Sequence, residues 1–212
     1  GLSAAEELRK KGYQISIYDR YDRAGGLLIY GIPNFKLEKD VIIKRVNRLI
    51  KSGIKFYLNC EIGTTISFKK LKNQHDAILI STGVYKARSV NLNKNFSNVI
   101  PALEFLTANN KKNLGDTVKE FDSGRLNSFN KKVLVIGGGD TAMDCVRTSI
   151  RQGAISVKCL YRRDRENMPG SQREVSNAIE EGIEFEWLTI PTKYLGEKKL
   201  IYVEAINMQL TS

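Results

Sequence analysis

Short apolar runs alternate with helical stripes along much of the chain. In residues 38–52, Val41, Ile42, Val46, Leu49 and Ile50 recur at helical spacing, which predicts a helix with a buried face. Shorter helices are predicted over 102–109, 140–152 and 173–181. Apolar runs typical of strands occupy 14–18, 55–59, 76–81, 133–136, 156–161, 184–188 and 200–205. Strands that alternate with helices in this way favour an α/β fold with parallel sheets.

The most informative segment follows the apolar strand Val133–Ile136. Gly137, Gly138 and Gly139 form a turn there, and the next helix is predicted to begin at Asp140. In such a fingerprint the first glycine allows a tight turn, Gly139 lets a diphosphate approach the backbone, and Ala142 keeps the helix close to the sheet. The free amides and the positive dipole end of the helix then face the phosphates. The segment therefore predicts a dinucleotide site.

Two arginines, Arg162 and Arg163, follow the next strand. An enzyme that uses NADH usually has a carboxylate at this place, bound to the ribose 2′-hydroxyl, whereas arginine there predicts NADPH. The alternative is a glycine-rich turn that binds nothing, with both arginines merely solvated. The strand, the helix and the arginines together favour the nucleotide site.

The start of the chain has the pattern of a second unit of this kind. Gly1 precedes a predicted helix, which Gly12 ends, and the strand over 14–18 runs into Asp19. If Gly1 is the last glycine of a fingerprint, Asp19 stands near the usual separation for a carboxylate that binds a ribose hydroxyl. The alternative is an ordinary surface aspartate. Farther on, the pair Gly25–Gly26 permits close approach of a ligand to the backbone.

Four longer motifs carry a resemblance to a known family. They are GGLLIYGIPNFKL at 25–37, STGVYKAR at 81–88, GGGDTAMDC at 137–145 and YRRDRENMPGSQREV at 161–175. Together they resemble the small (beta) subunit of bacterial glutamate synthase, over nearly the whole chain except about 109–130. The reductase half of dihydropyrimidine dehydrogenase and the small subunits of some archaeal electron-transfer enzymes share the plan, but the arginine-rich run favours glutamate synthase.

This resemblance implies an electron-input module. NADPH would give hydride to FAD, and electrons would leave through 4Fe-4S clusters to a large subunit that makes glutamate from 2-oxoglutarate and glutamine-derived ammonia. The residues that match FAD contacts are Gly1, Leu2, Asp19, Arg20, Gly26, Leu27, Thr82 and Gly83. Those that match NADPH contacts are Gly137, Gly139, Asp140, Thr141, Ala142, Arg162 and Arg163. No catalytic acid or base and no metal ligand is expected.

The resemblance also implies a domain plan. We expect a partial FAD-binding domain at 1–102, a linker helix and loop at 103–130, and an NADPH-binding domain at 131–212. Both Rossmann-like domains are expected to be incomplete, with the cluster-binding cysteines, the first flavin strand and a carboxyl-terminal flavin segment outside the chain. The loop at 168–171 is either a cover over the cofactor or a plain turn that caps the next helix through Ser171, and both can hold at once.

Composition narrows the possible partners and location. The 212 residues are 42% hydrophobic, which is typical of soluble globular proteins, and neither a membrane span nor a leader stands out, so a cytoplasmic protein is expected. The net charge of +11 comes from scattered lysines without a basic helix, so no nucleic-acid partner is expected.

Cys60, Cys145 and Cys159 are far apart and are expected to be reduced thiols. His75 is expected to be a loop residue.

Two further interpretations stay open at this point. The chain could belong to a related flavin reductase, similar to dihydropyrimidine dehydrogenase or linked to ferredoxin, that serves another electron acceptor. It could also be a degenerate module that binds a nucleotide or supports assembly, since half of the flavin site is expected to lie outside it.

Overall fold

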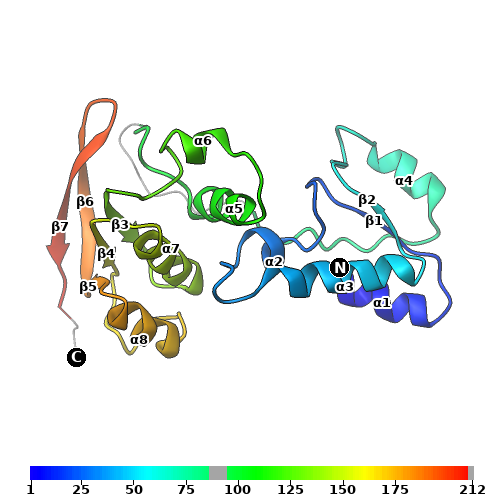
Figure 1. The fold of residues 1–212 in the computed structure, drawn as a ribbon, viewed down its shortest axis with the longest axis horizontal. Helices are drawn as coiled ribbons and strands as arrows, with labels where there is room; N and C mark the ends of the chain where they lie inside the picture. Colours follow the sequence, from blue (N-terminus) through cyan, green and yellow to red (C-terminus); the bar gives the residue numbers. More distant parts are fainter. Residues whose placement is uncertain (86–94, 210–212) are drawn as a thin grey trace. The chain divides into compact units, whose positions relative to one another are not determined.

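The computed structural model describes residues 1–85 and 95–209, and the chain forms two units (Figure 1). Unit 1 consists of residues 1–30 and 34–86, and unit 2 of residues 31–33 and 87–212. Both units combine helices with parallel strands, so the predicted α/β class is confirmed. The predicted domain limits after residues 102 and 130 stay a prediction, because they concern which nucleotide each part binds.

Unit 1 holds a small parallel sheet with helices packed on it. Its sheet pairs β1 (Ser16–Tyr18) with β2 (Lys55–Tyr57), Ile17 lying opposite Phe56. Its helices are α1 (Leu2–Lys10), α2 (Leu27–Tyr30), α3 (Lys39–Lys51) and α4 (Phe68–Gln74). Ala5, Leu49 and Ile54 form the buried cluster between α1, α3 and the sheet. Apolar spacing on α1 and α3 therefore produces the core that the sequence predicts.

The predicted stripe of α3 is narrower in the structure. Ile42 and Leu49 are buried, and Val46, which lies between them on the same face, is half-buried. Val41 and Ile50 stand to either side of this face, and they are 53% and 49% exposed. The expectation that all five residues belong to the core is thus wrong for these two.

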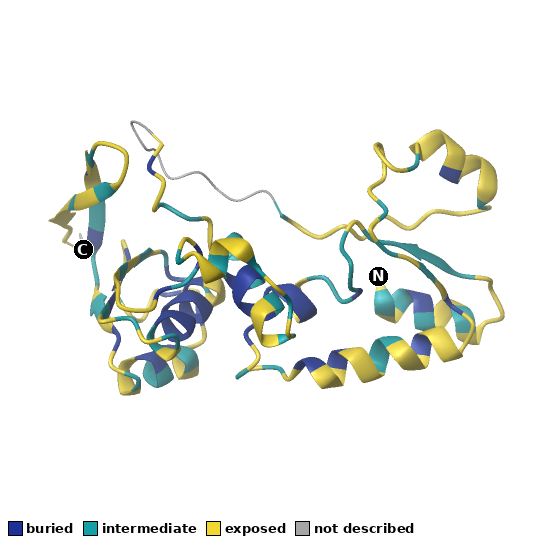
Figure 2. Ribbon diagram, turned by 45° about the horizontal axis from the view of Figure 1, so that its top comes forward, coloured by how far each residue is buried: buried dark blue, intermediate teal, exposed yellow. Residues whose placement is uncertain are grey.

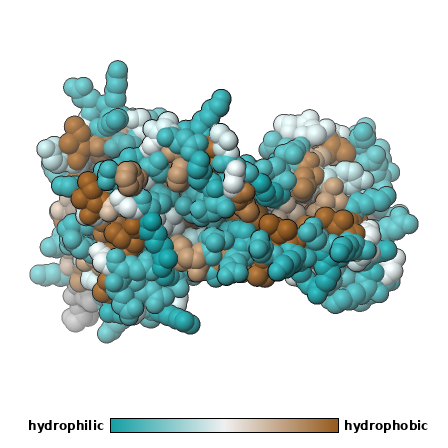
Figure 3. All heavy atoms as spheres, viewed as in Figure 1, coloured by the Kyte–Doolittle hydropathy of each residue, from teal (hydrophilic) through white to brown (hydrophobic). Residues whose placement is uncertain are grey.

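The segment predicted as a strand at 76–81 is not one. Residues 77–81 are irregular, and Leu79 and Ile80 are 64% and 70% exposed. An apolar strand is buried only where neighbouring strands cover its edges and another layer covers its faces. In the described part of unit 1 the sheet has two strands, and neither pairs with this segment. The space-filling view shows several hydrophobic patches, coloured brown, on a mostly hydrophilic surface (Figure 3).

Unit 2 is built on a three-stranded parallel sheet in the order β3 (Lys132–Ile136), β4 (Ser156–Leu160) and β5 (Glu184–Glu186). Helices α7 (Asp140–Arg151) and α8 (Gln172–Glu180) pack with it. In α7, all residues from Ala142 to Ser149 are buried (Figure 2). The core cluster comprises Ala142, Met143, Val146, Val157, Cys159, Tyr161, Met168, Val175, Ala178 and Ile183.

Strand β3 is covered on one face in the described residues. Val133 and Val135 pack against the core cluster, whereas Leu134 and Ile136 are 38% and 39% exposed. A continuous apolar run is typical of a strand buried on both faces, and β3 differs from this pattern. Side chains alternate between the two faces of a strand, so one covering layer buries only every second residue.

Other elements of unit 2 lie outside the predicted pattern. Helix α5 (Ala102–Asn113) is longer than predicted, and α6 (Lys119–Asp122) lies in the stretch expected to be a loop. Strand β6 (Thr189–Gly196) was not expected, and it pairs antiparallel with β7 (Leu200–Asn207). The register of this pair shifts between Pro191 and Lys193, and prolines within sheets are often found at such bulges.

The thiols and the helices bear on the remaining expectations. Cys60, Cys145 and Cys159 are free. Burial raises the pKa of the Cys145 thiol, and it raises that of Cys159 to about 12, so both stay protonated near neutral pH.

None of the helices within residues 1–85 and 95–209 combines the length and the apolar character that crossing a bilayer requires.

Candidate functional site

The glycine turn of unit 2 joins the end of β3 to the start of α7. Gly137 has a φ of +141°, which favours glycine, and its amide donates to the carbonyl of Leu160 at 3.0 Å. The carbonyl of Gly139 accepts from the amide of Ala142 at 2.8 Å, which starts the helix. A Cβ built on Gly139 would meet no atom within 4 Å. The turn is therefore fixed at its first residue and open at its third.

Gly138, the middle glycine, is closed in by an aromatic ring. A Cβ on this residue would lie 2.4 Å from two ring carbons of Tyr161, which is far below any real contact distance. Tyr161 is 8% exposed and follows strand β4, so it has little room to yield. The glycine pattern predicts no role for Gly138 beyond the turn, because the contact with Tyr161 leaves no signal in the spacing of glycines.

The loop after Tyr161 packs onto this turn. The amide of Gly170 donates to the carbonyl of Gly138 at 3.0 Å, and the Tyr161 hydroxyl donates to the carbonyl of Asn167 at 3.2 Å. Met168 is 5% exposed and belongs to the core. Ser171 stands at the N-cap position of α8, but its side chain makes no capping hydrogen bond there. The backbone of the loop, and not the Ser171 hydroxyl, thus sets its conformation.

Arg162 and Arg163 begin this loop, and both are exposed. Neither guanidinium makes a hydrogen bond or an ion pair with another described residue, although the carbonyl of Arg163 accepts from the amide of Leu188 at 3.1 Å. Arg165, three residues farther on, differs, because it donates to the Ser176 hydroxyl at 3.0 Å. Within the described part of the loop, the first two arginines are therefore the ones available for an anion.

Helices α7 and α8 are joined by a cluster of charges. Arg147 donates to Glu174 and to Glu181, both at 2.7 Å, and Arg151 also donates to Glu181 at 2.7 Å. Only 8% of the Arg147 side chain is exposed. Burial alone would raise the pKa of Glu181, but the hydrogen bonds from Arg151 and Arg147 lower it overall. This cluster holds α8, and with it the end of the arginine loop, against α7.

The residues predicted to contact FAD lie in unit 1. Gly1 precedes α1, and its carbonyl accepts from the amide of Ala5 at 2.9 Å. A Cβ on Gly1 would lie 2.8 Å from the Ser81 hydroxyl, so the start of α1 stands beside the segment that contains Thr82 and Gly83. Leu2 packs against the core cluster of unit 1.

Asp19 and Arg20 follow strand β1. One carboxylate oxygen of Asp19 accepts from the amide of Tyr21 at 3.0 Å, which forms a tight turn. Arg20 stacks over two rings, with its guanidinium carbon 5.0 Å from the ring centre of Tyr21 and 4.5 Å from that of Tyr85. Such cation–π contacts hold a guanidinium in place, and one Arg20 nitrogen also donates to the Tyr21 hydroxyl at 3.3 Å.

Tyr85 brings several of the predicted FAD residues together. A Cβ on Gly26 would lie 3.4 Å from the Tyr85 hydroxyl, and one on Gly83 would lie 3.5 Å from its ring. Both glycines have positive φ, +54° and +70°. Burial raises the pKa of Tyr85, with smaller contributions from neighbours that include Asp19. Leu27 and Thr82 are exposed. Lys86, Ala87 and Arg88 of the same motif lie outside the described residues.

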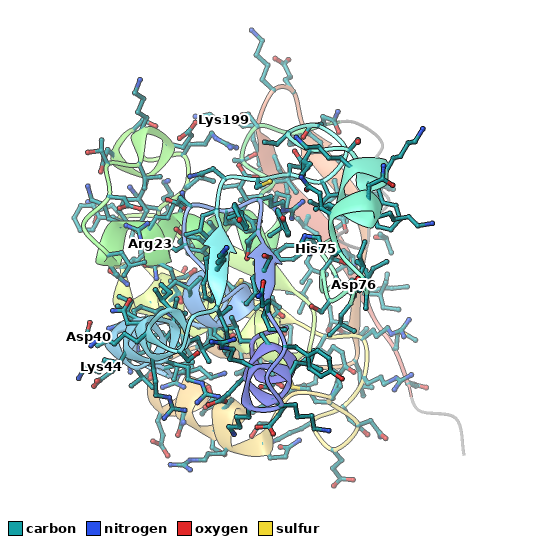
Figure 4. All side chains as sticks on the ribbon, turned by 90° about the vertical axis from the view of Figure 1, so that its right-hand side faces the viewer. Arg23, Asp40, Lys44, His75, Asp76 and Lys199 are labelled. Carbon is teal, nitrogen blue, oxygen red and sulfur yellow. The ribbon has the colours of Figure 1, made fainter. Side chains whose placement is uncertain are left out.

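His75 ends helix α4, as Figure 4 shows with its neighbour Asp76. Its Nε2 lies 3.1 Å from the hydroxyl of Tyr18, whose ring stacks on Tyr57 at 4.7 Å. The residue follows the helix in a connecting segment, as predicted, and its hydrogen bond gives it a structural role in unit 1.

Known proteins match this chain over nearly its whole length. The family model described as pyridine nucleotide-disulphide oxidoreductase matches residues 1–210. The glutamate synthase (NADPH) small chain of Azospirillum brasilense is 55% identical over 211 residues, which are 99% of this chain and 44% of that protein. The putative counterpart from Cereibacter sphaeroides is 59% identical over 197 residues, 92% of this chain and 47% of that protein. The chain spans less than half the length of these relatives.

A solved structure supports the fold independently. FprA of Mycobacterium tuberculosis in complex with NADPH has a TM-score of 0.83 to this chain at 15% identity, covering 100% of this chain and 62% of that one. At this identity the likeness shows the fold alone. The predicted Rossmann-type α/β class is confirmed by the family match and by this neighbour.

Proposed function

The chain belongs to the pyridine nucleotide-disulphide oxidoreductase family, and from this premise we propose that it is the electron-input part of an NADPH-dependent flavoprotein of the glutamate synthase small-subunit type. The identities of 55% and 59% to small chains of that enzyme support this assignment over other members of the family. The single observation that carries the proposal is the glycine turn of unit 2 with two exposed arginines after the adjacent strand.

The residues of unit 2 fit NADPH. Gly139 has no neighbour within 4 Å of a built Cβ, so a diphosphate can approach the backbone at the start of α7. The free amides there and the helix dipole attract negative charge. Arg162 and Arg163 are exposed at the end of the neighbouring strand, where a 2′-phosphate needs a cation. We assign the NADPH site to Gly137, Gly139, Asp140, Thr141, Ala142, Arg162 and Arg163.

The residues of unit 1 are assigned to FAD in the same way. Asp19, at the end of β1, is suited to a ribose hydroxyl, and the positive-φ residues Gly26 and Gly83 allow close approach of a ligand. The cation of Arg20, held by Tyr21 and Tyr85, is suited to a phosphate. The complete assignment comprises Gly1, Leu2, Asp19, Arg20, Gly26, Leu27, Thr82 and Gly83.

The chemistry needs little from the side chains of this chain. When bound, the nicotinamide supplies a hydride and the flavin accepts it. The protein groups named above bind and orient the two nucleotides, and no protein acid or base has to move a proton. Outside this chain, we propose that 4Fe-4S clusters and the glutamate synthase large subunit receive the electrons, in the cytoplasm. A reductase with another acceptor is the alternative.

The test is a comparison of thermal unfolding with NADPH and with NADH. At a concentration one hundred times the dissociation constant, a ligand stabilises its protein by about 2.7 kcal/mol. We expect NADPH to raise the melting temperature clearly and NADH to raise it less at equal concentration. An equal or absent shift with both would refute the NADPH assignment. A second assay measures electron transfer from the whole protein to the glutamate synthase large subunit. Transfer would support that acceptor, and its failure would favour the alternative reductase.

A further inference from the structure

Asp140 places a negative charge at the start of α7, where the proposed function puts an anionic diphosphate. A carboxylate at this position favours the helix dipole, but it repels the ligand. The structure shows a second interaction for this side chain. Its Oδ1 accepts from the amide of Ser171 at 3.0 Å, and Ser171 is the residue before α8. Asp140 therefore connects the start of one helix to the start of the other.

A second contact lies beside the first. The amide of Gly170 donates to the carbonyl of Gly138 at 3.0 Å, and a Cβ on Gly170 would lie 3.0 Å from that same carbonyl oxygen. The backbones of the loop and the turn are thus in direct contact, and a side chain at residue 170 would crowd the carbonyl of Gly138. Two successive amides of the loop, those of Gly170 and Ser171, are bound by the glycine turn and by Asp140.

The loop held in this way begins with the arginine pair. It runs from Arg162 to Ser171, and at its start the carbonyl of Arg163 accepts from Leu188. Its middle is fixed by the buried Met168 and by the contact of the Tyr161 hydroxyl with Asn167. The bond to Asp140 closes its far end. Two hydrogen bonds thus join the loop to the glycine turn. One is between backbone groups, and the other uses the side chain of Asp140.

We propose that Asp140 is a positioning residue, whose carboxylate holds the loop 162–171 on the glycine turn and so keeps Arg162 and Arg163 in place for the 2′-phosphate of NADPH. This inference rests on the proposed function of unit 2. It explains a carboxylate at a site meant for an anion, because the hydrogen bond to Ser171 offsets the repulsion. Preference for NADPH over NADH then depends on a residue that need not touch the 2′-phosphate.

Two substitutions separate the acceptor from the charge. Asp140→Asn keeps an oxygen that can accept from Ser171 but removes the charge, whereas Asp140→Ala removes both. Loss of the charge acts on the diphosphate, which NADPH and NADH share, so it changes both dissociation constants alike. The ratio of the NADH constant to the NADPH constant therefore reports the loop alone.

The control is Glu180→Ala, which also removes one carboxylate. Glu180 is exposed in the last turn of α8 and makes no hydrogen bond or ion pair among the described residues. We expect Asp140→Ala to lower the ratio about fivefold, the net value of one ordinary hydrogen bond. Asp140→Asn should change it by less than about twofold, and Glu180→Ala should leave it unchanged. An equal fall in the Ala and Asn variants, or no fall in either, would overturn the proposal.

Hydrogen exchange without cofactor tests the contact separately. The amide of Ser171 should exchange about tenfold faster in Asp140→Ala than in the original protein, and about as slowly in Asp140→Asn. Equal exchange in all three proteins would overturn the inference whatever the nucleotide preference. If the original protein shows no preference for NADPH while Ser171 behaves as expected, the proposed function fails and the contact itself stands.

Discussion

The two units differ in how well neighbouring elements cover the segments proposed to bind a nucleotide. In unit 2, Gly137 is bonded to β4, Gly138 is enclosed by Tyr161, and α7 is buried over eight successive residues from Ala142 to Ser149. In unit 1, the described sheet has two strands, and the apolar segment 77–80 beside the proposed site is exposed. Similar apolar runs therefore have opposite outcomes. Neighbouring strands and helices therefore decide whether such a run becomes a buried strand.

We expect the greatest loss of stability when the charge cluster of unit 2 is broken. Arg147→Ala in unit 2 removes a buried cation shared by Glu174 and Glu181, and loss of such a partner costs about 3–5 kcal/mol. The matched change in unit 1 is Arg45→Ala, because Arg45 pairs with Glu6 but 35% of its side chain is exposed. We expect it to cost about 0.2–1 kcal/mol. Denaturant unfolding measures both, and equal losses would remove the distinction.

Substitution of a glycine comes next. Gly138→Ala forces a methyl group onto the ring of Tyr161, and overpacking of this kind costs about 1–3 kcal/mol. The matched change is Gly12→Ala in unit 1, where φ is +93° but no atom lies within 4 Å of the added carbon. Backbone strain alone should cost about 1 kcal/mol there. Urea denaturation curves of the two variants give the comparison, and a smaller loss at Gly138 would contradict the packing argument.

Several of these features could be predicted from the sequence, and others could not. The glycines and the start of α7 at Asp140 agree with the prediction, because turn and helix-start signals are local. The hairpin partner β6 was missed, since Pro191 reads as a strand breaker and its bulge depends on pairing with β7. Helix α4 was missed although Ser67 accepts from the amide of Lys70, a capping signal that the sequence does contain.

The parts of the candidate site that depend on distant contacts were beyond the sequence. The bond from Ser171 to Asp140 joins residues that are 31 positions apart. Arg147 meets Glu174 and Glu181 only because α7 and α8 pack side by side. The same limit explains the error at 76–81, whose apolar pattern does not say whether a neighbouring strand covers it.

Arg162→Ala tests the nucleotide preference of unit 2. A guanidinium bound to a phosphate contributes about 1.5–3 kcal/mol, so NADPH affinity should fall about tenfold to a hundredfold. NADH affinity should change little, because NADH lacks the 2′-phosphate. Arg165→Ala is the control. Arg165 lies in the same loop, but its guanidinium is already bound to Ser176 and Gln172 of α8. Titration calorimetry with both nucleotides decides, and equal losses would refute the 2′-phosphate assignment.

Replacement of Glu181 should change the pH dependence of stability only slightly. The pKa of Glu181 is lower in the folded protein than its usual value of 4.5, so its ion pairs stabilise the fold above that pH. This contribution is lost as the pH falls through the folded pKa. In Glu181→Gln the loss of stability below about pH 4.5 should therefore be shallower. Unfolding free energies from pH 6 to pH 3 would show this, and parallel curves would contradict it.

In our assignment, the turn before Asp140 binds the diphosphate of NADPH while the arginines after β4 bind its 2′-phosphate. A crystal structure of the protein with NADPH is the decisive experiment. We expect a diphosphate within hydrogen-bonding distance of the backbone amides at the start of α7, with Arg162 or Arg163 on the 2′-phosphate. A nucleotide bound elsewhere, or both guanidinium groups turned to solvent beside a bound nucleotide, would contradict it.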